Sequence, residues 1–182
     1  MSVTALREAL IAHGGTVASL VDGRLTAQDG SGRGSDGAGS QPGVGAPQRA
    51  AQGPRTHGRA AEYELLLEMI LEGSLLHYGA PRVVTTEDRD LALLLGDQLY
   101  ALGLARLAEI GDLDSVSELS DLISLLSQAQ LQGDEALARA IWEAGATAIG
   151  WGATPEHEAA KELARTGDAA AVPALLQSAG AT

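Results

Sequence analysis

From Arg59 onward the sequence is a succession of leucine- and alanine-rich segments whose apolar residues recur with a helical period. Leucine and alanine are strong helix formers, whereas the β-branched residues that favour strands are sparse. The chain has no Phe, so two Trp and three Tyr supply its only aromatic rings besides histidine. No segment has the alternating pattern of a strand. The sequence therefore predicts an all-α fold, an antiparallel helix bundle.

Glycine, proline and capping residues mark where the helices begin and end. Three apolar patterns predict helices over about 3–21, 59–76 and 86–110. Four further helices are predicted: one with a capping box at Ser115 and Glu118, EALARAIWEAGATAIGW after Gly133-Asp134, one that starts at Thr154-Pro155, and a short one after Gly167-Asp168. Gly14-Gly15 weakens the first pattern, which we interpret as a single helix.

The predicted helix 86–110 is apolar almost all round, through LALLLGDQLYALGLARLA. It is long enough to cross a bilayer, so a membrane span has to be weighed. Asp97, Gln98 and Arg106 would each be costly in the hydrocarbon core. We therefore expect a central, buried helix and no transmembrane segment.

Residues 29–58 hold nine Gly and three Pro, with little apolar bulk. The stretch 32–37 matches G-x-G-x-x-G, but neither a strand before it nor a helix directly after it is predicted, so a nucleotide site is not indicated. The composition is typical of a flexible linker. We predict an N-terminal helix within 1–28, a disordered Gly-rich insert over 29–58 and a helical bundle domain over 59–182.

The charge distribution excludes several partners. The net charge is −12, and residues 60–150 alone hold 16 acidic residues against four Arg. Such a surface repels phosphate backbones and anionic lipids, so we expect no nucleic-acid partner. The chain has no Cys and its first residues lack the layout of a signal peptide. A cytoplasmic location is predicted.

No metal or catalytic motif is predicted. The histidines His13, His57, His77 and His157 fall in four different segments. His157-Glu158 begins like a zinc-protease motif, but Lys161 stands where the second histidine ligand should be. The sequence therefore assigns no catalytic, cofactor-binding or metal-binding residue.

Two polar features interrupt the apolar helices. Residues 72–79, EGSLLHYG, end one helix with a histidine and a tyrosine, and Gly96-Asp97 lies in the middle of the most apolar helix. A carboxylate at that position needs a donor, because an unpaired buried charge is costly. We predict that Asp97 is buried and structural, and that Gly96 lets a neighbouring helix approach closely.

These two features also carry a resemblance. AAEYELLLEMILEGSLLH, then LLLGDQLYAL and LARLAEIGDLDSVSELSDLISLLSQAQ in the same order, resemble successive helices of the trans-polyprenyl diphosphate synthases. The resemblance covers about 59–152 and implies part of the isoprenoid synthase fold. Where that family continues with two aspartates, this chain has Tyr78-Gly79, and hard carboxylate oxygens that would hold Mg²⁺ are missing.

The chain is most similar to the non-catalytic small component of two-component heptaprenyl and hexaprenyl diphosphate synthases. The resemblance implies a subunit without a cofactor of its own, because Mg²⁺ would belong to a catalytic prenyl synthase partner. Its role would be to help set the length of a quinone side chain, such as that of menaquinone, and a homodimer is an alternative assembly. Small residues are expected to line an apolar product tunnel: Ala101, Gly103, Ala105, Gly145 and Ala146.

Two other readings remain open. LARTGDAAAVPALLQ resembles a HEAT-type helical repeat, which would make the chain an acidic adaptor unrelated to isoprenoids. Alternatively, the chain is an enzyme that acts only within a complex, or one with a different chemistry in the same fold. The last reading requires Asp97, Glu72 and Glu68 to converge on a cavity.

Overall fold

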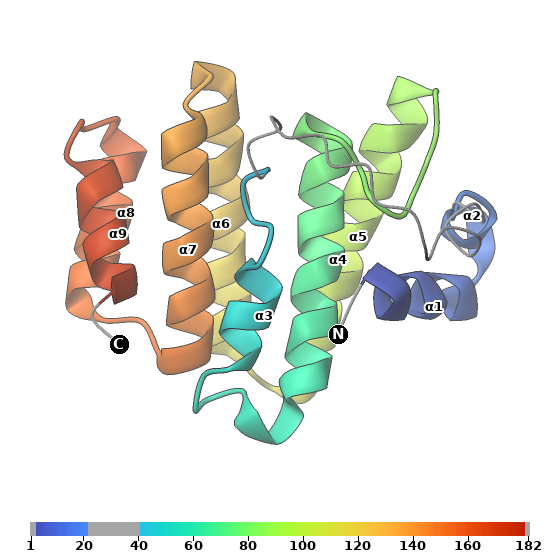
Figure 1. Cartoon of the computed structure of the whole chain (residues 1–182), viewed down its shortest axis with the longest axis horizontal. Helices are drawn as coiled ribbons and strands as arrows, with labels where there is room; N and C mark the ends of the chain where they lie inside the picture. The colour runs from blue at the N-terminus through green and yellow to red at the C-terminus, as the bar shows by residue number, and fades with distance from the viewer. Residues whose placement is uncertain (1–2, 22–40, 181–182) are drawn as a thin grey trace, which may run out of the picture.

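The computed structural model describes residues 3–21 and 41–180, which form a series of helices (Figure 1). Their bounds are α1 (Val3–His13), α2 (Gly15–Ser19), α3 (Ala46–Ala51), the 3-10 helix η2 (His57–Arg59), α4 (Ala60–Tyr78), α5 (Arg89–Ile110), α6 (Leu113–Gln132), α7 (Glu135–Trp151), α8 (Pro155–Thr166) and α9 (Ala171–Gly180). In these ranges no strand forms, and the one β-bridge joins Val21 to Val84. The predicted all-α fold is confirmed.

Three antiparallel helix pairs, α4–α5, α6–α7 and α8–α9, lie side by side (Figure 1). The short helix α3 fits between α4 and α7, and α1 runs across the α4–α5 pair at the edge of the molecule. The larger apolar core is formed by α3, α4, α6, α7, α8 and α9, together with Leu107 of α5. A second core, which includes Leu6, Leu10 and Val17, fixes α1 and α2 to α5 and the end of α4.

A Gly-Asp pair makes three of the turns between consecutive helices. Gly111, Gly133 and Gly167 have φ values of 84°, 68° and 71°, the left-handed conformation that ends a helix without strain in a residue lacking Cβ. The aspartate that follows each glycine accepts backbone N–H groups at the start of the next helix, as Asp134 does from Leu137 at 2.8 Å. The predicted starts at Gly133-Asp134 and Thr154-Pro155 are confirmed.

Two predicted helix ends are wrong. The helix predicted over 3–21 is two helices, because Gly14, with φ 80°, breaks it after His13. The predicted capping box of α6 is replaced by Asp112, whose carboxylate accepts the backbone N–H of Ser115 at 3.1 Å. The side chain of Glu118 turns instead into the interior, where it binds α8.

The prediction of a flexible linker over 29–58 is wrong for residues 41–58. Residues 41–58 belong to the folded body: Ala46 and Ala50 of α3 are buried in the larger core, and Gly53 lies against the backbone of Gly150. Composition misled the prediction because alanine and glycine serve here to bring two backbones close together, not to keep the chain free. The rest of the predicted insert, up to residue 40, lies outside the described residues.

Arg55, in the same segment, connects three elements. Its backbone N–H donates to the carbonyl of Gly150 at 3.0 Å, and its guanidinium donates to the carbonyl of Ile149 at 3.1 Å. The guanidinium also reaches Asp112 at 3.3 Å, where the hydroxyl of Tyr63 donates at 2.5 Å. Burial and the hydrogen bond to Asp112 raise the pKa of Tyr63 to about 12. This network holds the segment to α7 and to the α5–α6 turn.

The prediction that 86–110 forms a central buried helix is also wrong. α5 packs one side against α4, while Leu94 is 67% exposed. By length and composition α5 is the one described helix that could cross a membrane, and 28% of its most apolar window is buried in the fold. The helices at the centre are α4 and α7, on either side of α3.

Candidate functional site: an apolar groove beside α4

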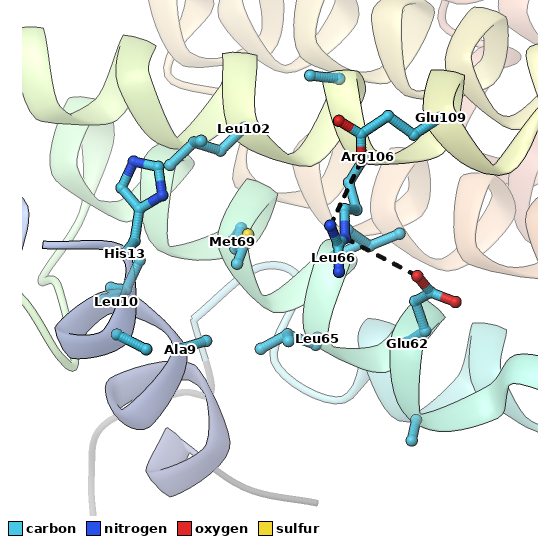
Figure 2. Close-up of a pocket in the computed structure, with 13 residues that line it drawn as sticks. Ala9, Leu10, His13, Glu62, Leu65, Leu66, Met69, Leu102, Arg106 and Glu109 are labelled. Carbon is cyan, nitrogen blue, oxygen red and sulfur yellow. Dashed lines mark hydrogen bonds and ion pairs between the residues drawn. The ribbon is translucent and has the colours of Figure 1, made fainter.

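An open groove of about 730 Å³ lies between α1, α4 and α5 (Figure 2). Its volume is in the range of small-molecule sites in proteins. Its walls are formed by Ala9, Leu10, Ala12 and His13 of α1, Ala61, Glu62, Leu65, Leu66 and Met69 of α4, and Leu102, Ala105, Arg106 and Glu109 of α5. The lining is predominantly apolar, which suits a hydrocarbon ligand.

The groove exists because α4 is apolar on two sides. Leu66 and Ile70 are fully buried in the larger core, while Leu65 and Met69, one position earlier in each turn, are half-buried and face α1. The helix α1 is anchored by Leu10, which is also fully buried, and leaves a gap beside these side chains. Burying a leucine contributes roughly 1.5–3 kcal/mol, so α1 is a firm wall.

The charged residues of the groove gather at one end. Arg106 lies between two acids, with its Nε 3.8 Å from Glu62 and its Nη1 3.3 Å from Glu109. Figure 2 shows this ionic group on one side and His13 on the other, with Met69 and Leu102 between them. The lining contains no Ser, Thr, Cys or Lys, and its two carboxylates lie beside Arg106, on the side away from His13.

Of the small residues that are expected to line a tunnel, only Ala105 is among the residues that line the groove. Ala101 is exposed, and Gly103 lies against Ile70 in the α4–α5 contact. Gly145 and Ala146 are buried in α7, far along the chain from the groove. The side chains that sequence reasoning missed are Leu65 and Met69, and the signal that could have found them is the second apolar side of α4.

The end of α4, residues 72–79, is a contact with α5. His77 Nε2 lies 3.1 Å from Asp97 Oδ1, and the His77 ring stacks on Tyr100 with a centroid distance of 5.3 Å. A Cβ at Gly96 would lie 2.6 Å from the His77 ring, so the predicted close approach at Gly96 is confirmed. Burial raises the pKa of Tyr100 above its ordinary range.

Asp97 is not buried, which contradicts the prediction. Its side chain is 71% exposed, because it lies at the edge of the α4–α5 contact, beside His77 of α4. Beside it, a hollow of about 580 Å³ is lined by Leu76, His77, Tyr78, Gly79, Arg89, Leu93, Gln130 and Leu131. That lining holds one arginine and no carboxylate, so within the described residues nothing there offers Mg²⁺ a cluster of hard oxygen ligands.

Glu68 and Glu72 of α4, by contrast, are buried. The carboxylate of Glu72 is fully buried and accepts the backbone N–H groups of Arg82, Val83 and Val84 at 2.9, 2.7 and 3.0 Å. One turn earlier, Glu68 accepts from the guanidinium of Arg82 at 2.5 Å. These carboxylates fix the α4–α5 connection. They do not converge with Asp97 on a cavity, as the active-enzyme reading requires.

A second buried network joins α6 to α8. Lys161 is 4% exposed, and its Nζ lies 2.8 Å from both Glu118 and Asp121 and 2.9 Å from Glu158. His157 Nε2 lies 2.8 Å from Glu118. Burial alone would lower the pKa of Lys161, but hydrogen bonds to the acids outweigh burial and raise it. The lysine that interrupts the zinc-protease pattern therefore supplies the positive charge itself. His57, by contrast, is exposed in η2.

We expect Asp121 to make stability depend on acid pH. Burial alone would raise the pKa of Asp121, but hydrogen bonds from Lys161 and Arg165 outweigh it and hold the pKa below the ordinary value of 3.8. A carboxylate with a depressed pKa stabilises the fold above its unfolded pKa, and this contribution is lost as the pH falls through the folded pKa. The stability gap between wild type and Asp121→Asn should therefore close below about pH 4.

Urea denaturation at a series of pH values measures this gap. The control is Asp90→Asn, because Asp90 is exposed in the first turn of α5. A gap for Asp121→Asn that stays constant from neutral pH to pH 2.5 or so would contradict the assignment of this carboxylate to the Lys161 network.

The chain matches no family model, no curated protein and no solved structure significantly.

Proposed function

We propose that the chain is a non-catalytic subunit that binds a catalytic prenyl diphosphate synthase and holds the growing hydrocarbon chain in its apolar groove. The observation that supports this most is the position of the groove on α4. The groove residues Ala61 to Met69 precede His77 on the same helix, and Met69 is about 12 Å from His77 along the axis at 1.5 Å per residue. A chain that grows away from a diphosphate at that end would lie along these residues.

The proposal leaves catalysis to the partner. Ionisation of an allylic diphosphate needs Mg²⁺ held by clustered carboxylates, whereas Glu68 and Glu72 of α4 are engaged by the α4–α5 connection. The partner would therefore supply Mg²⁺ and the reacting groups. The same proposal places the protein in the cytoplasm and makes the product the side chain of a quinone such as menaquinone.

The outer side of α5 is the surface that we assign to this partner. Leu94 is 67% exposed there, and Ala101 and Ala108 allow a second helix to come close. The acidic span 60–150 favours a partner whose facing surface is basic. Such complementarity steers association as well as setting the partner's identity.

A second candidate function is an acidic helical adaptor. Two antiparallel pairs, α6–α7 and α8–α9, stack on each other, and a Gly-Asp turn closes each pair. Stacked helix pairs of this kind form the binding surfaces of helical-repeat proteins. An adaptor would bind a protein partner without any isoprenoid in the groove.

The test combines the chain with each catalytic trans-prenyl diphosphate synthase of the same organism, with isopentenyl diphosphate, an allylic diphosphate and Mg²⁺. We expect no product from the chain alone and longer products from the pair than from the synthase alone. Leu65→Trp should shorten these products by filling the groove, whereas Leu113→Trp, at a position 67% exposed on α6, should not.

Mass spectrometry of the products and size-exclusion chromatography of the mixture give the two readouts. Products of unchanged length and no complex with any synthase would contradict the proposed function. A complex with an unrelated protein, formed equally by Leu65→Trp, would favour the adaptor. Turnover by the chain alone at about 1 per second, typical of an enzyme, would contradict a non-catalytic role.

A further inference from the structure

We propose that the groove binds the uncharged form of a long isoprenoid chain, an alcohol or the bare hydrocarbon end, and discriminates against a diphosphate. The choice of an isoprenoid rests on the proposed function. The discrimination rests on the charges at the groove's polar end, which are described in this structure.

The arginine that lines the groove, Arg106, is already neutralised. Arg106 has Glu62 at 3.8 Å on α4 and Glu109 at 3.3 Å on its own helix, so the group of three carries a net charge of −1. At the other end the lining offers His13. A diphosphate needs several hydrogen-bond donors or cations that are free to bind it. The Arg106 end of the groove offers it mainly the carboxylate acceptors of Glu62 and Glu109.

The electrostatic field of the surrounding surface is also negative. The span 60–150, to which α4 and α5 belong, carries 16 acidic residues and four Arg. An anion that approaches the groove is therefore repelled over about 8 Å at physiological ionic strength. A hydroxyl group meets no such repulsion, and it can donate to either carboxylate and accept from the Arg106 guanidinium.

The apolar part of the groove determines which hydrocarbon portion the ligand can have. Leu65, Met69 and Leu102 line the stretch between the two ends, and the volume of about 730 Å³ accommodates a long hydrocarbon chain. Transfer of each CH₂ group from water into such a site is favourable by about 0.8 kcal/mol, which for a chain of this kind outweighs the single hydrogen bond of the alcohol.

Geranylgeraniol and geranylgeranyl diphosphate are the probes, titrated separately against the full chain in a calorimeter. We expect the alcohol to bind at least about tenfold more tightly at low salt, and the gap to narrow as salt is added, because salt screens the repulsion. The double variant Glu62→Lys, Glu109→Lys should reverse the preference. The single variant Leu65→Trp should abolish binding of the alcohol, with Leu113→Trp as control and circular dichroism to check each fold.

Equal or tighter binding of the diphosphate to the wild type would overturn this inference and leave the proposed function intact, since that function is judged by complex formation and product length. Binding of neither probe, or binding that Leu65→Trp does not reduce, would overturn the groove as the ligand site. A preference for the alcohol that the double variant leaves unchanged would overturn the assignment to Glu62 and Glu109.

Discussion

The variant Gly53→Ala is expected to lose at least about 3 kcal/mol of folding stability, or not to fold. A Cβ on Gly53 would lie 2.1 Å from the carbonyl oxygen and 2.3 Å from the Cα of Gly150. Real Cβ atoms essentially never come this close to other atoms, and the obstacle is backbone on α7, not a side chain that can rotate away. Relief requires the loop that follows α3 to move off α7. Insertion of a methyl group into a packed site costs 1–3 kcal/mol even where side chains can adjust, so about 3 kcal/mol is a lower bound here.

Gly58→Ala is the matched control. It lies five residues further along the same Gly-rich segment, in η2, and a Cβ there would have no atom within 4 Å. Alanine at an unstrained position also restricts the unfolded chain, so the change should be neutral or stabilising by up to about 1 kcal/mol.

Urea denaturation followed by circular dichroism measures both variants. If Gly53→Ala and Gly58→Ala unfold at the same urea concentration as the wild type, residues 41–58 are a linker, as their composition predicts, and the packing of Gly53 on Gly150 is wrong.

The helix boundaries could be read from the sequence wherever one local contact decides them. Gly133-Asp134 ends α6 and starts α7 through a left-handed glycine and an aspartate cap, and both depend only on neighbouring residues. The glycines of 41–58 could not be read in this way. Whether a glycine gives freedom or permits close packing depends on what lies across from it, and Gly150 is far away in the sequence.

The roles of the acids could not be assigned for a similar reason. A helix that is apolar almost all round, like α5, has no pattern that shows which side faces the core. The sequence therefore predicts Asp97 inside, whereas its side chain is exposed and the carboxylate of Glu72 is fully buried. The partners of Glu72 are backbone N–H groups beyond the end of α4, and a sequence pattern of side chains does not reveal such donors.

The groove depends on a third kind of information. Leu65 and Met69 are visible in the sequence as apolar positions of α4, but the cavity arises from where α1 crosses them. The second core that fixes this crossing joins residues of α1 to Leu95 and Leu99 of α5. Such contacts between distant segments set the binding surface, whereas helix periodicity sets only which residues are available for it.

The second large effect is expected at Glu72, where Glu72→Ala should cost about 3–5 kcal/mol. The change removes the acceptor of three backbone N–H groups, those of Arg82, Val83 and Val84. Both valines are fully buried, so water cannot replace the carboxylate without opening the α4–α5 connection. Each buried donor left unpaired costs about 1–3 kcal/mol, and the guanidinium of Arg82 loses one of its acidic neighbours as well.

Glu72→Gln separates charge from hydrogen bonding, since it keeps one acceptor oxygen and should cost less than Glu72→Ala. Glu87→Ala is the control, because Glu87 is exposed just before α5 and its loss should change stability by less than about 0.5 kcal/mol. Chemical denaturation of all three, alongside the geranylgeraniol titration and the synthase assay, tells a structural carboxylate from a functional one. Suppose instead that Glu72→Ala is as stable as Glu87→Ala but abolishes geranylgeraniol binding or the effect on the synthase. Glu72 would then act at a functional site, and the interpretation of the chain as an enzyme, in which this carboxylate reaches a ligand, would be the better one.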